Sequence, residues 1–271
     1  MLRVTLPGLF AFLLSTERPA VRAEPVQDPA VRGRLFRLSQ LRIFFGHQSV
    51  GMNLLEGVRE IAARHPEIPL RVSEVAGELP ARTFGHAFMA ENGKPELKLE
   101  GFERALSSGI GSVADVALLK FCYADFSRNT DPAALFARYQ ATLRALQARY
   151  PRLTFVHVTV PLTTVDTSAK SAVKRLLGRA PGGLLENARR EEFNALLRRA
   201  FAGKEPLFDL ALLESTAPGG AREQHKWNGR MIPALLPAYT EDGGHLASST
   251  RSWFAQQFVA ALASAPLLPH E

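Results

Sequence analysis

The sequence predicts an α/β protein in which helices cover both faces of a five-stranded parallel sheet. Five strand-like and five helix-like segments alternate between residues 41 and 265, and such alternation is typical of a parallel sheet with helical crossovers. The run SVADVALLKFCY, residues 112–123, is the most continuous apolar stretch of the core and indicates a central strand buried on both faces. The chain has 271 residues, 46% hydrophobic and 22% charged, which suits a globular protein with a large core.

The first half of the chain supplies two strands and two helices. Residues 41–45 (LRIFF) form a short apolar run, and residues 51–65 place apolar side chains at helical spacing. Residues 70–76 (LRVSEVA) alternate as a strand does. Residues 77–93 contain several glycines and a proline, so we expect an irregular loop there, followed by a helix from Pro95 to about residue 106.

The second half continues the alternation. Asp131 and Pro132 suit the cap and first turn of a helix that extends to about residue 150. We then expect strands at 152–162 and 206–215 and helices at 184–203 and 248–265. Ligands of parallel α/β sheets bind outside the carboxyl ends of the strands, so residues after the first strand and before the last helix should meet there.

Residues 1–23 have the plan of a secretory signal peptide. A short basic start precedes 11 apolar residues, VTLPGLFAFLL, and Val21 and Ala23 occupy the small positions before the expected cleavage site. The apolar stretch is too short to cross a bilayer in the ordinary way. We therefore expect export to the periplasm or the extracellular space, no stable membrane insertion, and a single domain at residues 24–271.

The net charge of +7 does not indicate a nucleic-acid protein. Residues 1–23 hold three arginines and one glutamate, so the remainder keeps 30 of 33 basic and 25 of 26 acidic residues, a charge of +5. The basic residues are scattered among acidic ones, as on a solvated surface. The single cysteine, Cys122, lies in an apolar run and is expected to be a buried thiol.

Two short stretches carry the candidate chemistry. Ser49 stands in FGHQSVG, directly after the first strand, and Asp242 and His245 stand in EDGGHL, directly before the last helix. A serine hydroxyl needs a base within hydrogen-bond reach to act as a nucleophile. Histidine serves as such a base, and a carboxylate on its other ring nitrogen fixes its tautomer. The glycines between Asp242 and His245 allow the sharp turn that this pairing needs.

These two stretches resemble the SGNH (GDSL-like) hydrolase family. The resemblance implies a flavodoxin-like three-layer α/β/α fold, with Ser49 as nucleophile, His245 as base and Asp242 as acid. It implies a serine esterase that needs no cofactor and acts on a small-molecule or glycan ester, including acylated carbohydrates or lipids. The similarity in element order covers residues 24–271, whereas the motifs amount to about a dozen residues.

The chain departs from the family pattern at the oxyanion donors. The family's third block falls on residues 122–125, where its asparagine is replaced by Ala124. The Ser49 backbone N–H is one remaining donor, at a helix start. The family's second block matches ENGKP best, so Gly93 is assigned as a further N–H donor, with Gly85 as the alternative. Asn92 is a hypothetical substitute for the missing asparagine.

Several polar residues near these blocks have two interpretations. His47 either lines the mouth of the site beside Ser49 or makes a structural hydrogen bond in the turn. Asp125 is expected to orient a loop, and Lys120 to pair with it. Among the other histidines, His157 is expected in the core and His225 is a candidate for substrate contact, whereas three are expected on the surface or in loops, namely His65, His86 and His270.

Four alternatives remain open or are disfavoured. An α/β-hydrolase would carry glycine two residues before the nucleophile, where this chain has His47. Metal-ligand spacings are lacking, so no metal site is expected. A non-catalytic binding protein on the same scaffold is the main alternative, and an O-acyltransferase is another. Residues 77–93 and 214–240, the latter with Trp227, are expected as substrate-selecting loops. The sequence does not indicate the oligomeric state.

Overall fold

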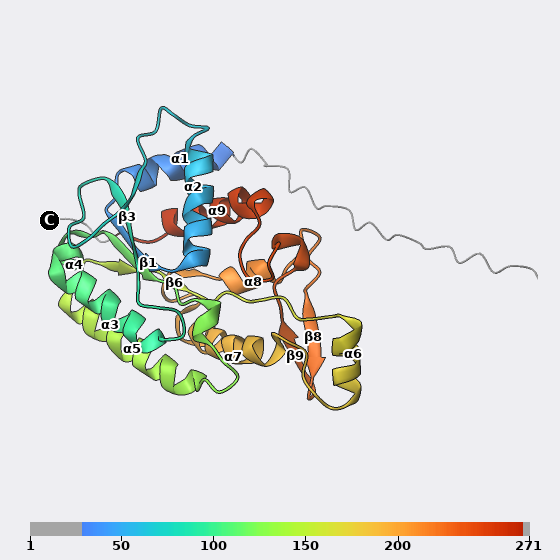
Figure 1. The fold of residues 1–271 in the computed structure, drawn as a ribbon. Helices are drawn as coiled ribbons and strands as arrows, with labels where there is room; N and C mark the ends of the chain where they lie inside the picture. The colour runs from blue at the N-terminus through green and yellow to red at the C-terminus, as the bar shows by residue number, and fades with distance from the viewer. Residues whose placement is uncertain (1–28, 268–271) are drawn as a thin grey trace, which may run out of the picture.

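The computed structural model describes residues 29–267, and the predicted signal peptide lies outside them. Figure 1 shows the arrangement of the elements. The helices are α1 Pro29–Ser39, α2 Ser49–Ala62, α3 Pro95–Ala105, α4 Gly111–Val113, α5 Pro132–Arg149, α6 Ala169–Leu176, α7 Leu184–Phe201, α8 Leu210–Glu214 and α9 Ser248–Ala263. The strands are β1 Ile43–His47, β2 Arg71–Glu74, β3 Thr83–Phe88, β4 Val116–Leu119, β5 Thr154–Phe155, β6 His157–Val158, β7 Leu207–Phe208, β8 Gln224–Trp227 and β9 Arg230–Pro233.

The central sheet has five parallel strands in the order β2-β3-β1-β4-β5. Strand β1 is in the middle, and its Phe45 lies opposite His86 of β3 and Leu118 of β4. All five residues of β1 are buried, as expected of a strand covered on both faces. The prediction of a three-layer α/β/α fold is confirmed. The carboxyl end of β1, where Ser49 follows, is therefore flanked by strands on both sides.

Alternate side chains of the central strands belong to two different cores. Ile43 and Phe45 pack with α1, α2 and α9, whereas Phe44 packs with α3 and α5. The same alternation divides β4, whose Val116 and Leu118 join the first core and whose Ala117 and Leu119 join the second. This period of two places a helical layer on each face of the sheet. In Figure 1, α1, α2 and α9 lie on one side and α3, α5 and α7 on the other.

Strand β3 corrects the expectation of an irregular loop at residues 77–93. Thr83–Phe88 (TFGHAF) pairs with β1 over five residues and with β2 over four. Gly85 within it accommodates the chain that precedes it, because a Cβ there would lie 2.5 Å from Leu79. Glycine usually weakens a strand. Gly85 is required here because Leu79 packs closely against it.

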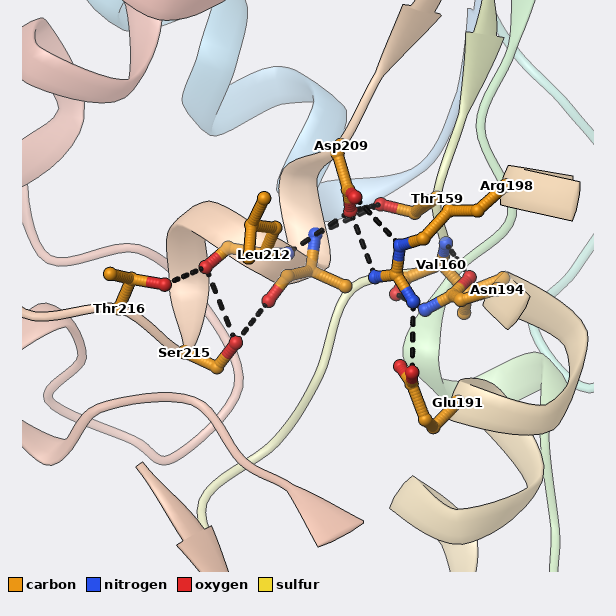
Figure 2. Close-up of polar contacts among 10 residues, drawn as sticks. Thr159, Val160, Glu191, Asn194, Arg198, Asp209, Leu212, Ser215 and Thr216 are labelled. Carbon is orange, nitrogen blue, oxygen red and sulfur yellow. Dashed lines mark hydrogen bonds and ion pairs between the residues drawn. The ribbon is translucent and has the colours of Figure 1, made fainter. Parts of the chain in front are cut away.

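The predicted strand at 206–215 is mostly helical. Only Leu207 and Phe208 form β7, which pairs with β6, and Asp209 then caps the short helix α8. Figure 2 shows how this carboxylate is held. It accepts hydrogen bonds from the Leu212 N–H (3.1 Å) and the Thr159 hydroxyl (3.2 Å), and it forms an ion pair with Arg198 of α7 (2.6 Å). Asp209 is therefore a structural residue that ties β7 to α7.

The region beside the sheet holds elements that the alternation did not predict. Strands β8 and β9 form an antiparallel hairpin whose turn is Asn228-Gly229, both with positive φ. Helix α6 lies next to this hairpin at the periphery (Figure 1), and the Arg175 guanidinium is 3.3 Å from the His225 ring. Among the described helices, none is both long and apolar enough to cross a membrane.

Candidate active site

Ser49 is the first residue of α2 and directly follows the end of β1. Gln48 precedes it with extended backbone, and the Gln48 side chain donates hydrogen bonds to the carbonyls of Met89 and Ala90 instead of capping the helix. The first N–H groups of a helix have no intrahelical acceptor, and among the described residues the Ser49 N–H has no hydrogen-bond partner. The half-buried serine therefore combines a hydroxyl with an unoccupied backbone donor.

Gly51, two residues later, is required by the packing of His47. A Cβ at Gly51 would lie 2.4 Å from the Cβ of His47, closer than any real contact. The glycine thus lets the first turn of α2 fold back against the end of β1. This close approach accounts for the second glycine of FGHQSVG and fixes the direction in which Ser49 leaves the strand.

His47 has the structural role, and it does not line an open site. Its ring is fully buried, with Nδ1 3.0 Å from the Gln48 carbonyl and Nε2 3.1 Å from Nδ1 of His86. Burial lowers the pKa of His47 to about 3 and also lowers the pKa of His86. His86 is correspondingly not a surface residue: it lies buried in β3, 3.3 Å from the Arg59 guanidinium of α2.

Asp242 and His245 form the pair that the sequence predicts. The Asp242 Oδ2 atom lies 2.5 Å from Nδ1 of His245, and Oδ1 accepts the backbone N–H groups of Gly244 (2.9 Å) and His245 (2.8 Å). These N–H groups and the His245 side chain hold the pKa of Asp242 well below its usual range. Gly243 makes the turn with φ +87°. The carboxylate can therefore fix the tautomer that leaves Nε2 free to accept a proton.

A contact across most of the chain connects the two halves of the site. The Leu246 N–H, next to His245, donates to Oδ1 of Asn53 at 3.2 Å. Asn53 lies four residues after Ser49 on α2, so the two side chains occupy the same face of the helix. Helix α9, which follows the His245 turn, also packs along α2. Among the described residues, the Ser49 hydroxyl itself makes no hydrogen bond to His245.

Tyr123 is the site residue that the sequence reasoning missed. Its hydroxyl lies 3.4 Å from Nε2 of His245, and the two rings meet edge to face. The Arg190 guanidinium lies over the Tyr123 ring and donates to its carbonyl at 3.0 Å. A Cβ at Gly244 would lie 2.8 Å from this ring. The only feature of the sequence that indicates Tyr123 as a site residue is its position one residue before Ala124, in the block matched to the family's oxyanion asparagine.

The Asp125 carboxylate occupies one of the expected oxyanion donors. It accepts the Gly93 N–H (2.8 Å), the Cys122 N–H (2.7 Å) and the Lys98 ammonium (2.7 Å). The prediction that Asp125 orients a loop is confirmed. The Gly93 N–H is therefore engaged in this structure, and Asn92 uses its side-chain oxygen to accept from Lys98 at 2.9 Å. The exposed Asn92 keeps its NH2 group for other partners.

The expected Lys120–Asp125 pair is wrong, because Lys98 of α3 takes that position. Lys98 and Asp125 are both fully buried at their side chains and lie 2.7 Å apart. The Lys120 ammonium instead donates to the Phe121 carbonyl at 3.0 Å, and burial lowers its pKa to about 8. Burial also raises the pKa of the neighbouring Glu214 to about 8.

The remaining candidates have structural environments. The prediction for His157 is confirmed: it is fully buried, 2.7 Å from the Tyr139 hydroxyl. The Cys122 thiol is buried as expected. His225 lies in β8, 3.0 Å from Glu223, and Trp227 packs in a small apolar cluster beside it. His270 lies outside the described residues. Within residues 29–267, no three acidic, histidine or cysteine side chains gather as metal ligands.

Comparison with known proteins assigns no family to the chain. No family model and no curated protein matches the sequence. One similar solved chain is "The structure of a putative platelet activating factor from Streptococcus pneumonia", with a TM-score of 0.47, 12% identity, and coverage of 86% of this chain and 92% of that one.

Two further structures are less similar. Salicylyl-acyltransferase SsfX3 from a tetracycline biosynthetic pathway has a TM-score of 0.41 at 12% identity, and the match covers 85% of this chain and 57% of that one. The C-terminal domain of the Drosophila Oskar protein has a TM-score of 0.39 at 10% identity, over 81% and 86%. All three TM-scores are below 0.5, so these similarities carry no argument about activity.

Proposed function

We propose that the protein is a serine-dependent acyl-ester hydrolase with Ser49 as nucleophile, His245 as base and Asp242 as acid. The observation that supports this most is the Asp242–His245 pair at 2.5 Å, in a segment hydrogen-bonded to the helix that Ser49 begins. A carboxylate on Nδ1 directs the Nε2 lone pair outward, as general-base catalysis requires. The half-exposed His245 is accessible to a ligand.

The proposed reaction follows from the chemistry of these three groups. The Ser49 oxygen bonds to the ester carbonyl carbon while its proton passes to Nε2 of His245. The tetrahedral intermediate expels the alcohol, which takes that proton, and an acyl-Ser49 ester remains. Water repeats the sequence, releasing the carboxylic acid and returning the proton to Ser49. Substrate binding must bring the Ser49 oxygen to within about 3 Å of Nε2 of His245. The Tyr123 hydroxyl contacts this nitrogen in the structure.

We propose two donors for the developing oxyanion. The unoccupied Ser49 N–H at the start of α2 is the first, since a helix N-terminus favours negative charge. The Tyr123 hydroxyl is the second, because it lies beside Nε2 and burial raises its pKa, which keeps it protonated. Asn92 remains a further hypothesis through its NH2 group. Kinetics of Asn92→Ala test it: a rise in KM with unchanged kcat removes Asn92 from the oxyanion hole.

The substrate class and location are proposals that rest on the sequence. The resemblance of the two motifs to SGNH hydrolases favours a small-molecule or glycan ester, and the apolar N-terminus favours export of a single domain at residues 24–271. O-acyl transfer would use the same acyl-Ser49 intermediate with an alcohol in place of water. Two observations favour a non-catalytic binding protein instead: the Gly93 N–H is occupied by Asp125, and Ser49 makes no hydrogen bond to His245.

Intact mass after incubation with a fluorophosphonate probe separates these functions. We expect one adduct on the wild-type chain and none on Ser49→Ala or His245→Ala. His225→Ala is the matched control, because this histidine lies in β8 beside Glu223, and it should label like the wild type. A folded wild-type chain that takes no adduct would overturn the hydrolase proposal and leave the binding protein.

A further inference from the structure

Helix α6 carries its apolar side chains on the solvent side. In a soluble globular protein an amphipathic helix turns its apolar face to the core. In α6 the fully buried residue is Ser171, whereas Val173 and Leu176 are 55% and 87% exposed. Leu177, directly after the helix, is 69% exposed. The polarity of this helix is therefore the reverse of that expected for a packed one.

The exposed apolar residues share one face and are surrounded by cations. Val173, Leu176 and Leu177 are spaced i, i+3 and i+4, which places them together on the helix surface. Residues 169–179 contain four basic residues and no acidic one, a formal charge of +4. These four are Lys170, Lys174, Arg175 and Arg179. An apolar face bordered by Lys and Arg is the pattern of a helix that lies in the interface of an anionic membrane.

A basic cavity adjoins α6, whose Lys174 is part of its lining. It has a volume of about 400 Å³, and its lining includes Lys174, Arg179 and the Arg128 guanidinium, with Glu186 as the acidic member. Glu186 lies 3.7 Å from Arg128, so two cations of the cavity have no acidic partner within it. The charge of the cavity complements the phosphate of an anionic lipid headgroup.

The helix is held in place by polar contacts at its start. Ser168 caps it, and the Ser171 hydroxyl donates to Asp166 at 2.5 Å. The preceding Thr164 donates its N–H to the Gly243 carbonyl at 2.9 Å, within the turn that carries Asp242 and His245. Four residues, 165–168, separate Thr164 from the first residue of α6, so a short segment connects this helix to the turn of the candidate active site.

We propose that α6 docks the protein on an anionic lipid surface. Val173, Leu176 and Leu177 enter the boundary between headgroups and acyl chains, and Lys174 and Arg179 bind the phosphates. This docking needs no catalysis and stands independently of the proposed hydrolase activity. Removing two leucines from an interfacial face weakens partitioning by about tenfold or more, and each basic residue near the surface contributes roughly fivefold.

Vesicle sedimentation of the full chain tests the proposal. We expect binding to phosphatidylcholine vesicles that contain phosphatidylglycerol, and weaker binding to phosphatidylcholine alone. Leu176→Ser/Leu177→Ser should lower the affinity about tenfold or more. Phe36→Ser/Met231→Ser, at two other exposed apolar residues, is the matched control and should bind like the wild type. All variants share the same N-terminal residues, so any contribution of those residues is common to them.

A charge-matched pair and a fluorescence variant complete the test. Lys174→Gln/Arg179→Gln should weaken binding more than Arg144→Gln/Arg199→Gln, which removes the same charge from exposed arginines on α5 and α7. Leu176→Trp should show a blue shift with the anionic vesicles. Equal binding by the leucine variant, the charge variant and the wild type overturns the proposal. Self-association of the chain without lipid, lost in Leu176→Ser/Leu177→Ser, also overturns it and assigns the face to a second copy.

Discussion

His47 and His86 lie side by side in the interior, with Nε2 of one 3.1 Å from Nδ1 of the other. Both rings are buried, and the pKa of His47 is lowered to about 3 by loss of solvation. In the unfolded chain His47 takes up a proton near pH 6.5, whereas in the folded chain it does so only near pH 3. Between these two pH values the unfolded state therefore binds more protons than the folded state. The free energy of unfolding should therefore fall as the pH is lowered.

We expect the titration of His47 to lower the free energy of unfolding by roughly 3 kcal/mol between pH 7 and pH 4. His47→Asn should flatten this part of the pH dependence, whatever its effect on stability at pH 7. Urea unfolding at several pH values measures it. An unchanged slope in His47→Asn would show that His47 is protonated equally in the folded and unfolded chains.

The Asp242–His245 contact predicts the effect of an isosteric change. Asp242→Asn keeps the shape of the side chain but favours the wrong tautomer of His245, so kcat for ester hydrolysis should fall roughly 10³- to 10⁴-fold. Glu241→Gln removes a neighbouring exposed carboxylate and should retain wild-type kcat. Steady-state kinetics on an ester that the wild type hydrolyses measure both. Full activity in Asp242→Asn would remove this carboxylate from the proposed mechanism.

The position of the Tyr123 hydroxyl predicts that removing it lowers kcat and leaves KM nearly unchanged. Tyr123→Phe removes the hydroxyl near Nε2 of His245 and keeps the ring under Arg190. If the hydroxyl stabilises the oxyanion, kcat should fall roughly a hundredfold with little change in KM. Tyr150→Phe is the control, because that hydroxyl contacts the Leu106 carbonyl. A change in KM alone in Tyr123→Phe would assign Tyr123 to substrate binding.

The Lys98–Asp125 pair predicts a large cost for removing one charge. Both side chains are fully buried and lie 2.7 Å apart. Lys98→Met leaves Asp125 buried without its counter-ion, which should lower the free energy of unfolding by about 3–5 kcal/mol. Lys94→Met, at a lysine that is 54% exposed and pairs with Glu91, should have no measurable effect. Urea unfolding compares the two, and similar curves for both variants would contradict the prediction.

The layers of the fold were predictable because hydrophobic periodicity is a local property. Residues 51–65 and 248–265 carry helical spacing, and α2 and α9 lie there. Strand β3 was not predictable, because its Gly85 is explained by Leu79, which folds back against it. The apolar run at residues 206–215 predicts one strand, whereas Asp209 caps a helix there. The β8–β9 hairpin has a local signal in its Asn228-Gly229 turn, because Asn-Gly favours the positive φ that such turns need.

In the candidate site, too, contacts between residues close in sequence were predictable and contacts between distant residues were not. The Asp242–His245 contact spans three residues and could be inferred from the Asp-Gly-Gly-His turn. The Tyr123–His245 contact spans 122 residues, and no local pattern indicates it. The partner of Asp125 depended on which lysine reaches it, and α3 rather than the end of β4 supplies that lysine. The partners of His245 and Asp125 can be assigned only once the packing of the helices against the sheet is known.

The hydrogen bond from Leu246 to Asn53 joins residues 193 positions apart. Helix α2 is made before its partner, because Leu246 follows Asn53 in the chain. A nascent chain that has emerged as far as α7 already contains Ser49 but has neither Asp242 nor His245 beside it. Ser49, Asp242 and His245 can therefore meet only after residues 242–246 have been made and have packed against α2.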